Sequence, residues 1–371
     1  MAIAFIDLAA QQARIKDKID ARIQAVLAHG KYIMGPEVKE LEEALCDFSG
    51  AKHCVSCANG TDALQLAVMA LGARVGDAVF CPSFTFAATA EAVYVLGASP
   101  VFVDIDPKTY NIDPASLRRA IAYAKEKGLT PRGIIPVDLF GLPADYDAIE
   151  AIAKEEGLWI IADSAQGFGA SYKGRKTGTF GDITTTSFFP AKPLGCYGDG
   201  GAIFTDNEDL AKHMDSLRVH GKGTHKYDNE RIGVNSRLDT IQAAILLEKL
   251  AIYEDEIERR QEVAQRYTAA LSNRFQTPLV PDGCTSVWAQ YTLSVLDGDD
   301  REAVMAKAKA AGVPTVVYYP RPLHQQTAYA KALTDTEGLI HSEEAAKRVF
   351  SLPMHPYLNG AMASKIVGAI L

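Results

Sequence analysis

The sequence predicts an α/β protein with a mostly parallel, doubly wound sheet and a smaller C-terminal α+β domain. Two observations support this fold class. Short apolar runs of strand length alternate with amphipathic stretches of helical periodicity, which is typical of βαβ units with helices on both faces of a sheet. The chain of 371 residues is also long enough for a large domain followed by a smaller one.

The first 250 residues are expected to form the large domain. Buried strands are predicted for the apolar runs at 78–82, 99–105, 133–140, 157–163, 182–189 and 200–205. The amphipathic stretches at 114–128 and 145–157 predict helices between them. Each of these stretches ends at a glycine, which is common just past a helix C-terminus.

Residues 251–371 are expected to form the smaller domain. Helical periodicity continues through 238–271, with charge concentrated after Ile252, and predicts one long helix that bridges the two domains. Beyond it, strands are predicted at 286–296 and 313–320, on either side of a helix at 302–312.

Composition excludes several classes of protein. Hydrophobic residues make up 48% of the chain and charged residues 23%, as in an ordinary globular protein. No apolar run reaches the roughly 20 residues that span a bilayer, and the first residues lack the pattern of a signal peptide. The net charge of −8 has no compensating basic cluster. We therefore expect a cytoplasmic protein that neither inserts into membranes nor binds nucleic acid.

The six cysteines are scattered along the chain, which is typical of reduced thiols rather than of a disulfide framework. Cys54 and Cys57 form a C-x-x-C pair, which occurs in redox centres and in half-sites for zinc. No second pair stands at metal-ligand spacing. We therefore favour small side chains in a strand-to-turn segment and expect no metal site.

A first candidate for ligand binding is the segment from Asn59 to Leu64, where a turn leads into a helical pattern. Gly60 lets the backbone approach a ligand closely, and the free N–H groups and dipole of the first helical turn favour an anion such as phosphate. The same residues are also typical of an ordinary helix N-cap. The segment alone leaves both interpretations open.

Asp163 is a second candidate, because it ends the apolar run WIIAD. The carboxyl ends of parallel strands are where α/β sheets bind ligands. A carboxylate at this place needs a partner, and the protonated pyridine nitrogen of pyridoxal phosphate is one. A helix N-cap or a structural ion pair is the alternative.

Lys192 is the third candidate and lies among apolar and small residues in SFFPAKPLG. Such surroundings remove solvation, make the neutral amine more accessible and allow a Schiff base with an aldehyde. Most lysines are instead solvated surface charges. The 29 residues between Asp163 and Lys192 (192 − 163) allow a hairpin or strand pair to bring both side chains to one cofactor.

Taken together, these motifs resemble the DegT family of nucleotide-sugar aminotransferases. GTDAL, the D-x-x-Q of Asp163 and Gln166, SFFPAKPLG and GVNSRLDTIQAAIL occur in the order of the family. The opening FIDLAAQQ, YIMGPEVKELE at 32–42 and the late YYPRPLH and LPMHP are also similar to it. The resemblance covers essentially the whole chain. It implies the fold-type-I aminotransferase architecture, pyridoxal phosphate as the cofactor and a homodimer.

The resemblance also assigns roles to single residues. Lys192 would bind the cofactor covalently and shuttle protons, while Asp163 would keep the pyridine nitrogen protonated and so preserve its electron-sink power. Phe86 would stack on the ring, although core packing is the commoner fate of a phenylalanine. The other implied cofactor contacts come from Gly60, Thr61, Gln166, Ser187 and, from the second subunit, Asn235.

The implied reaction has two halves. Glutamate converts the cofactor to pyridoxamine phosphate, and a nucleotide-linked keto sugar then takes the amino group, in the synthesis of precursors of surface polysaccharides such as lipopolysaccharide. SFFPAKPLGCYGDGGAIF and GVNSRLDTIQAAIL are most similar to the branch that aminates C3 of UDP-2-acetamido-2-deoxy-3-oxo-glucuronate. The resemblance also implies substrate contacts from Tyr319 and His324.

Arg237, on the same loop as Asn235, would enter the partner subunit's site and recognise the C6 carboxylate of this sugar, because a guanidinium can bind both carboxylate oxygens. A surface or interface salt bridge is the alternative. Tyr318 and the segment 324–329 depart from the pattern of that branch, so a dTDP-linked 3-keto-6-deoxyhexose remains a second substrate class. A pyridoxamine-dependent sugar dehydratase is disfavoured, because family dehydratases replace the lysine with histidine. A non-enzymatic regulatory role would not need Lys192.

Overall fold

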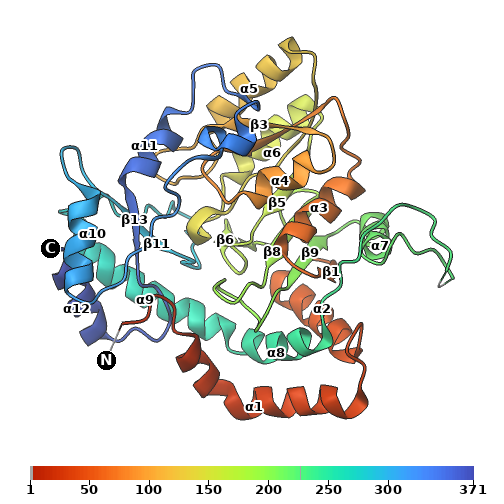
Figure 1. Cartoon of the computed structure of the whole chain (residues 1–371), viewed down its shortest axis with the longest axis horizontal. Coiled ribbons are helices and arrows are strands. Elements are labelled where there is room, and N and C mark those ends of the chain that lie inside the picture. Colours follow the sequence, from red (N-terminus) through yellow and green to blue (C-terminus); the bar gives the residue numbers. More distant parts are fainter. Residues whose placement is uncertain (1–2, 226) are drawn as a thin grey trace.

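The computed structural model describes residues 3–225 and 227–371. A large sheet lies between two layers of helices, and a smaller α+β region lies at the opposite side of the molecule from α7 (Figure 1). The eight strands follow the order β1-β9-β8-β5-β4-β2-β3-β12. The strands of this sheet are β1 (His53–Cys57), β2 (Asp77–Pro82), β3 (Ser99–Val103), β4 (Thr130–Ile134), β5 (Trp159–Asp163), β8 (Ile183–Ser187), β9 (Gly201–Thr205) and β12 (Leu333–Thr334).

The sheet is mostly parallel, as the sequence predicts. Only β9 runs antiparallel to its two neighbours, β1 and β8. The connection from β8 to β9 therefore lies at the carboxyl end of β8, and this connection carries Lys192. Because β5 is parallel to β8, the carboxyl end of β5, with Asp163, lies on the same side of the sheet.

Helices cover both faces because side chains alternate along each strand. In β2, Val79 and Cys81 join one apolar cluster, while Phe80 joins the cluster on the other face. The first face packs against α3 (Gly60–Ala70), α4 (Ala88–Tyr94) and α7 (Glu208–Leu217). The second face packs against α2 (Pro36–Ser49), α5 (Pro114–Glu126), α6 (Tyr146–Glu156) and α8 (Thr240–Leu250).

The expected helices at 114–128 and 145–157 form as α5 and α6. Gly157 ends α6 with φ 68° and donates its N–H to Ala153 O, which is the predicted glycine stop. The predicted strand at 133–140 is shorter at its end, because β4 stops at Ile134 and residues 139–141 form a turn of 3-10 helix. The buried side chain of Asp138, just before this turn, accepts hydrogen bonds from Ala144 N and Tyr146 Oη, which lie beyond it.

The single long helix predicted over 238–271 is wrong. The structure has two helices, α8 and α9 (Tyr253–Leu271), and Ile252 between them leaves the helical region with φ −111° and ψ 2°. Tyr253 fixes the break, because it is fully buried and donates its hydroxyl to Phe168 O at 2.5 Å. The apolar α8 packs against α1 (Leu8–His29) and α2, while the charged α9 runs on to the C-terminal region (Figure 1).

The C-terminal region is built around its own apolar cluster, which includes Tyr267, Phe350 and Ile366. Its short sheet pairs β11 (Tyr291–Ser294) with β13 (Val349–Leu352), and its helices are α10 (Arg301–Ala310), α11 (Ile340–Arg348) and α12 (Gly360–Ile370). The strand predicted at 286–296 forms in part, whereas 313–320 contributes only a bridge between Val316 and Ser351. A domain boundary at residue 250 stays a prediction.

The remaining elements are short. They are a three-stranded sheet of β6 (Ser171–Tyr172), β7 (Arg175–Lys176) and β10 (Cys284–Thr285), and the 3-10 turns η1 (Leu139–Gly141), η2 (Leu323–Gln325) and η3 (Thr327–Tyr329). Among the described helices, none is both long and apolar enough to cross a membrane. The described residues also contain no cluster of three or more side chains able to hold a metal ion.

Candidate active site

Asp163 lies at the carboxyl end of β5, where its side chain is almost fully buried. Its Oδ2 accepts a hydrogen bond from Thr89 Oγ1 at 2.9 Å, and its Oδ1 accepts one from Ala165 N at 3.2 Å. Burial raises the pKa of Asp163, and these hydrogen bonds and the charge of Lys192 act in the opposite direction. The carboxylate is thus held in place and has a cation nearby.

Lys192 follows β8 in the 188–200 loop. Burial lowers its pKa, and the attraction of Asp163 opposes that shift. The described part of the chain offers its ammonium group no hydrogen-bond partner. An amine that is partly desolvated and unpaired is suited to act as a nucleophile and as a proton carrier.

The start of α3 meets the end of β8. Asn59 caps the helix, because its Oδ1 accepts a hydrogen bond from Asp62 N at 2.8 Å. The ordinary N-cap, which was one of the two interpretations of this segment, is therefore present. A Cβ on Gly60 would lie 2.6 Å from Ser187 Cβ, so only glycine allows this approach. The first N–H groups of a helix have no intrahelical acceptor. The structure therefore brings Gly60, Thr61 and Ser187 together in an arrangement that can also hold a phosphate.

Gln166 and Tyr319 are in contact although they are far apart in sequence. Gln166 Nε2 donates to Tyr319 Oη at 3.0 Å, and Gln166 Oε1 accepts Phe140 N at 2.8 Å. Burial raises the pKa of Tyr319, so its hydroxyl stays protonated. This pair joins the segment after β5 to the C-terminal region beside Asp163.

Phe86 is not part of the core, because 57% of its surface is exposed. It lies after β2, three residues before the Thr89 that binds Asp163. The core-packing alternative for Phe86 is therefore excluded. A ring at this place is available to a planar ligand.

His324 is engaged within its own chain. Its Nδ1 lies 2.7 Å from Ser83 Oγ, and its Nε2 lies 3.1 Å from Glu343 Oε1. A substrate would have to displace one of these partners, so the substrate contact expected of His324 stays a prediction.

Asn235 and Arg237 lie together on the loop before α8. Arg237 Nη2 donates to Asn235 Oδ1 at 2.7 Å, and Asn235 is exposed. Ser236 between them accepts Ala58 N through its hydroxyl at 3.1 Å, which places this loop beside the turn that begins α3. A surface cavity of about 770 Å³ lies beside Arg237, and its lining also includes His220, Lys222, Tyr227, Asn229 and Arg231.

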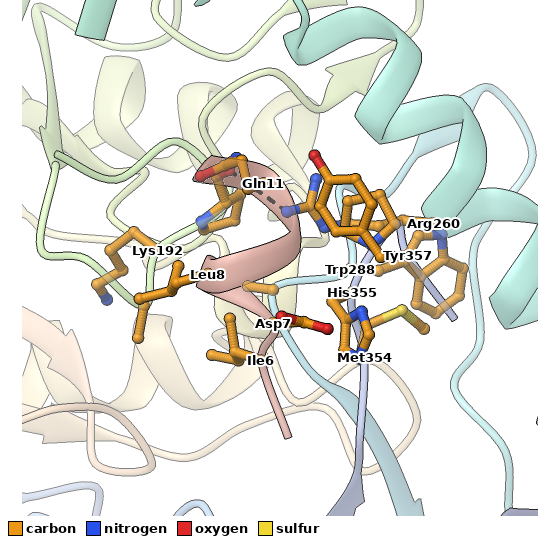
Figure 2. Close-up of a pocket in the computed structure, with 14 residues that line it drawn as sticks. Ile6, Asp7, Leu8, Gln11, Lys192, Arg260, Trp288, Met354, His355 and Tyr357 are labelled. Atoms are coloured by element: carbon orange, nitrogen blue, oxygen red, sulfur yellow. Dashed lines mark hydrogen bonds between the residues drawn. The ribbon is translucent and has the colours of Figure 1, made fainter. Parts of the chain in front are cut away.

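A second, smaller cavity lies behind Lys192. Figure 2 shows its lining residues, with the Lys192 side chain directed away from Arg260 and Tyr357. The cavity measures about 20 Å³, which is room for a water molecule and not for a sugar. This cavity is therefore too small to admit the substrate.

Thr89 is a site residue that the sequence does not reveal. It lies 74 positions from Asp163, at the start of α4, and a threonine near a helix start is common. Only the sheet order, which places the segment after β2 near the end of β5, brings the two side chains together.

These observations test whether the site fits pyridoxal phosphate. A lysine without a hydrogen-bond partner, a buried carboxylate at a strand end and a glycine-lined helix start supply the three contacts that the cofactor requires. The fold and site together define the class of pyridoxal-phosphate enzymes with the aminotransferase architecture.

Comparison with known proteins supports this class. The DegT/DnrJ/EryC1/StrS aminotransferase family model matches residues 13–371, and the chain belongs to this family. It is 55% identical to the UDP-2-acetamido-2-deoxy-3-oxo-D-glucuronate aminotransferase of Pseudomonas aeruginosa over 371 residues, 99% of each chain.

Solved structures agree with this assignment. A DegT DnrJ EryC1 StrS aminotransferase from Brucella abortus superposes with a TM-score of 0.97 at 53% identity, covering 99% of this chain and 98% of that one. NtdA from Bacillus subtilis, with bound cofactor PMP, gives 0.86 at 32% identity, covering 95% and 80%. The predicted fold class, family, enzyme class and cofactor are confirmed: the protein is a pyridoxal-phosphate-dependent aminotransferase of nucleotide sugars.

Proposed function

We propose that this aminotransferase transfers an amino group to C3 of UDP-2-acetamido-2-deoxy-3-oxo-glucuronate. The observation that carries the proposal is Arg237, which lies at the edge of a large surface cavity. Among the described residues, no carboxylate forms an ion pair with it, and its one side-chain hydrogen bond goes to Asn235. The 55% identity to an enzyme named for the same sugar supports the choice.

The charges around Arg237 suit an anionic sugar nucleotide. The cavity lining also carries Lys222 and includes no carboxylate, whereas its other arginine, Arg231, is already paired with Glu230. A guanidinium can bind both oxygens of a carboxylate, whereas a lysine offers one point charge. A substrate with a diphosphate and a uronate carboxylate matches this arrangement better than a neutral 6-deoxy sugar.

The chain's own residues provide orientation and proton transfer. When bound, the cofactor stores the amino group and spreads the negative charge that develops on the reacting carbon. Lys192 then moves a proton to and from that carbon, and Asp163 keeps the pyridine nitrogen protonated. Gly60 and Ser187 would hold the phosphate, and Phe86 would stack on the ring.

The other contacts complete the proposal. Gln166 would lie near the ring oxygen, and Thr61 would contribute to the phosphate site. Tyr319, which is hydrogen-bonded to Gln166, would contact the substrate, as would His324. Glutamate is the proposed amino donor. The pathway leads to precursors of surface polysaccharide, including lipopolysaccharide, and the six free cysteines support a reducing cytoplasm as its compartment.

We further propose a homodimer with shared active sites. Asn235 is exposed in its own chain, and its loop lies next to the start of α3. An exposed amide at this place is available to a phosphate held by a second copy. A single subunit would then have an incomplete site.

The experiment that tests the proposed substrate compares keto sugars as acceptors. The purified holoenzyme is given glutamate with the UDP-linked 3-keto uronate, its counterpart with a CH2OH group at C6, or a dTDP-linked 3-keto-6-deoxyhexose. We expect the highest kcat/KM for the uronate. A preference for either neutral sugar would overturn the proposal, and preference for the dTDP sugar would establish the second substrate class.

A further inference from the structure

The loop that carries Lys192 folds tightly back on itself. Lys192 N donates to Phe189 O at 2.8 Å at the first turn of this 188–200 loop. Gly195 closes against the same turn, because a Cβ on it would lie 2.6 Å from the carbonyl oxygens of Phe189 and Pro190. A shift of Gly195 therefore moves Phe189 and Pro190, the first two residues of the turn that carries Lys192.

Helix α8 holds this loop at two backbone positions. Lys249 Nζ donates to Gly195 O at 2.6 Å. About two turns earlier on the same helix, Gln242 Oε1 accepts a hydrogen bond from Tyr197 N at 2.9 Å. Lys249 also lies over the ring of Tyr197, with its Nζ 4.4 Å from the ring centre. Both contacts fall within five residues of Lys192.

Helix α9 adds a weaker third contact. Arg260 Nη2 lies 3.4 Å from Pro193 O, the carbonyl directly after Lys192 (Figure 2). Side chains from consecutive helices thus bind alternate residues of the loop, at 193, 195 and 197.

Lys249 is an unusual residue to find on this helix. Only 1% of it is exposed, and the described residues provide it with no ion pair. Its neighbours on α8 are mostly apolar, and a methionine of similar length would avoid the cost of burying an ammonium group. Burial lowers its pKa to about 8, so the side chain stays largely protonated at neutral pH. Stability alone does not explain a lysine here, whereas the bond to Gly195 O does.

We propose that Lys249 is a positioning residue, which fixes the loop so that Lys192 is directed toward Asp163, and that Gln242 assists it from the same helix. The proposal rests on the role of Lys192 put forward above. Lys249 touches neither substrate nor cofactor in this account and acts only through the backbone of Gly195.

The test compares Lys249→Met with a control on the neighbouring residue, Glu248→Gln. Glu248 lies on the same helix but pairs with Arg22 of α1, and among the described residues it has no hydrogen bond or ion pair with the loop. We measure kcat and KM of the holoenzymes, the midpoint of urea unfolding, and the rate at which each apoenzyme binds pyridoxal phosphate covalently, trapped by borohydride reduction and located on the Lys192 peptide.

We expect Lys249→Met to lower kcat and the rate of covalent attachment by about tenfold each, with KM within about twofold, because a small displacement of a reacting group costs rate rather than binding. The urea midpoint should stay unchanged or rise. Lys249→Arg, which keeps a donor, should recover part of both rates, and Glu248→Gln should match the wild type in all of them.

Wild-type rates in a folded Lys249→Met would overturn the proposal, as would a loss of rate that merely follows a loss of folded protein. If Lys249→Met does not fold, Gln242→Leu serves instead, since it removes the acceptor for Tyr197 N, and wild-type rates there would have the same meaning. Lys192→Ala distinguishes failure of the proposed function from failure of the positioning proposal. If Lys192→Ala retains turnover, the proposed role of Lys192 is refuted. If Lys192→Ala loses turnover but Lys249→Met keeps it, only the positioning role of Lys249 is refuted.

Discussion

Thr89 donates its hydroxyl to Asp163 at 2.9 Å and so fixes the carboxylate at the end of β5. The bond leaves the charged form of Asp163 better stabilised than burial alone would allow. A carboxylate that stays ionised in a buried place can keep a pyridine nitrogen protonated.

The first prediction concerns this carboxylate. Asp163→Asn should still bind the cofactor but lose most of its activity, because an amide cannot stabilise a pyridinium by charge. Thr89→Val should cause a smaller loss, on the order of tenfold, which corresponds to one buried hydrogen bond to a charged group. Steady-state kcat and cofactor content measure both effects. Near-normal rates for Asp163→Asn would mean that the residue is a structural cap.

The second prediction is that Lys192→Ala abolishes turnover and leaves the fold and assembly intact. The role of the residue is chemical, and its truncation removes no large core side chain. Circular dichroism and size-exclusion chromatography provide the controls for folding and assembly. Steady-state transamination by this variant would refute the assignment.

The third prediction tests the shared site. If subunits carrying Lys192→Ala and subunits carrying Asn235→Ala are co-refolded, one site of each hybrid dimer should have both lesions and the other neither. At equal mixing, half of the dimers are hybrids with one intact site, so about a quarter of wild-type activity should return. Hybrids that form, as shown by two affinity tags, and yet regain no activity would count against a shared site.

The fourth prediction concerns the C6 carboxylate. Arg237→Ala should lose activity chiefly on the uronate, by about 10- to 100-fold in kcat/KM, because a bidentate pair to a carboxylate contributes about 1.5–3 kcal/mol. Activity on the corresponding neutral UDP sugar should change little. Arg231→Ala, a change on the same cavity but at a residue paired with Glu230, is the matched control. Equal losses on both sugars would show that Arg237 does not recognise the carboxylate.

The fifth prediction is a pH dependence of stability. Burial lowers the pKa of His355 to about 4, below the ordinary value of 6.5, although the charge of Asp7 and the backbone of Ala4 act in the opposite direction. Between these values the unfolded chain binds more protons than the folded one, so stability falls as pH drops from 6.5 toward 4.

The measurement is the free energy of unfolding of wild type and His355→Leu from pH 7 to pH 4.5. The wild type should lose stability relative to the variant, by up to about 3 kcal/mol if the full shift applies. Asp138, whose pKa burial raises to about 6, titrates in an overlapping range but is present in both proteins and cancels in the difference. Parallel curves for the two proteins would contradict the prediction.

The fold class and the main site residues could be predicted because their signals are local. Asp163 ends an apolar run, and Lys192 stands in a short apolar segment. Each of these two signals is contained in a motif of nine residues or fewer. Thr89 and Lys249 have no such signal, because their partners are distant in sequence and only the packed structure shows them.

The break between α8 and α9 escaped prediction for a related reason. Periodicity shows that residues 238–271 are helical, but it does not show that the helix is interrupted at Ile252. The full burial of Tyr253 against the loop after β5 decides that, and it is a tertiary effect.

The reversal of β9 has a consequence for the order in which the site is assembled. Because β9 pairs antiparallel with β8, the two strands and the loop between them span only residues 183–205 and can associate while later segments are still being synthesised. The helices that hold this loop begin at Thr240 and end at Leu271. A nascent chain would therefore form the β8–β9 pair before it has the helices that position Lys192, so rapid cofactor binding would follow the synthesis of residues 240–271.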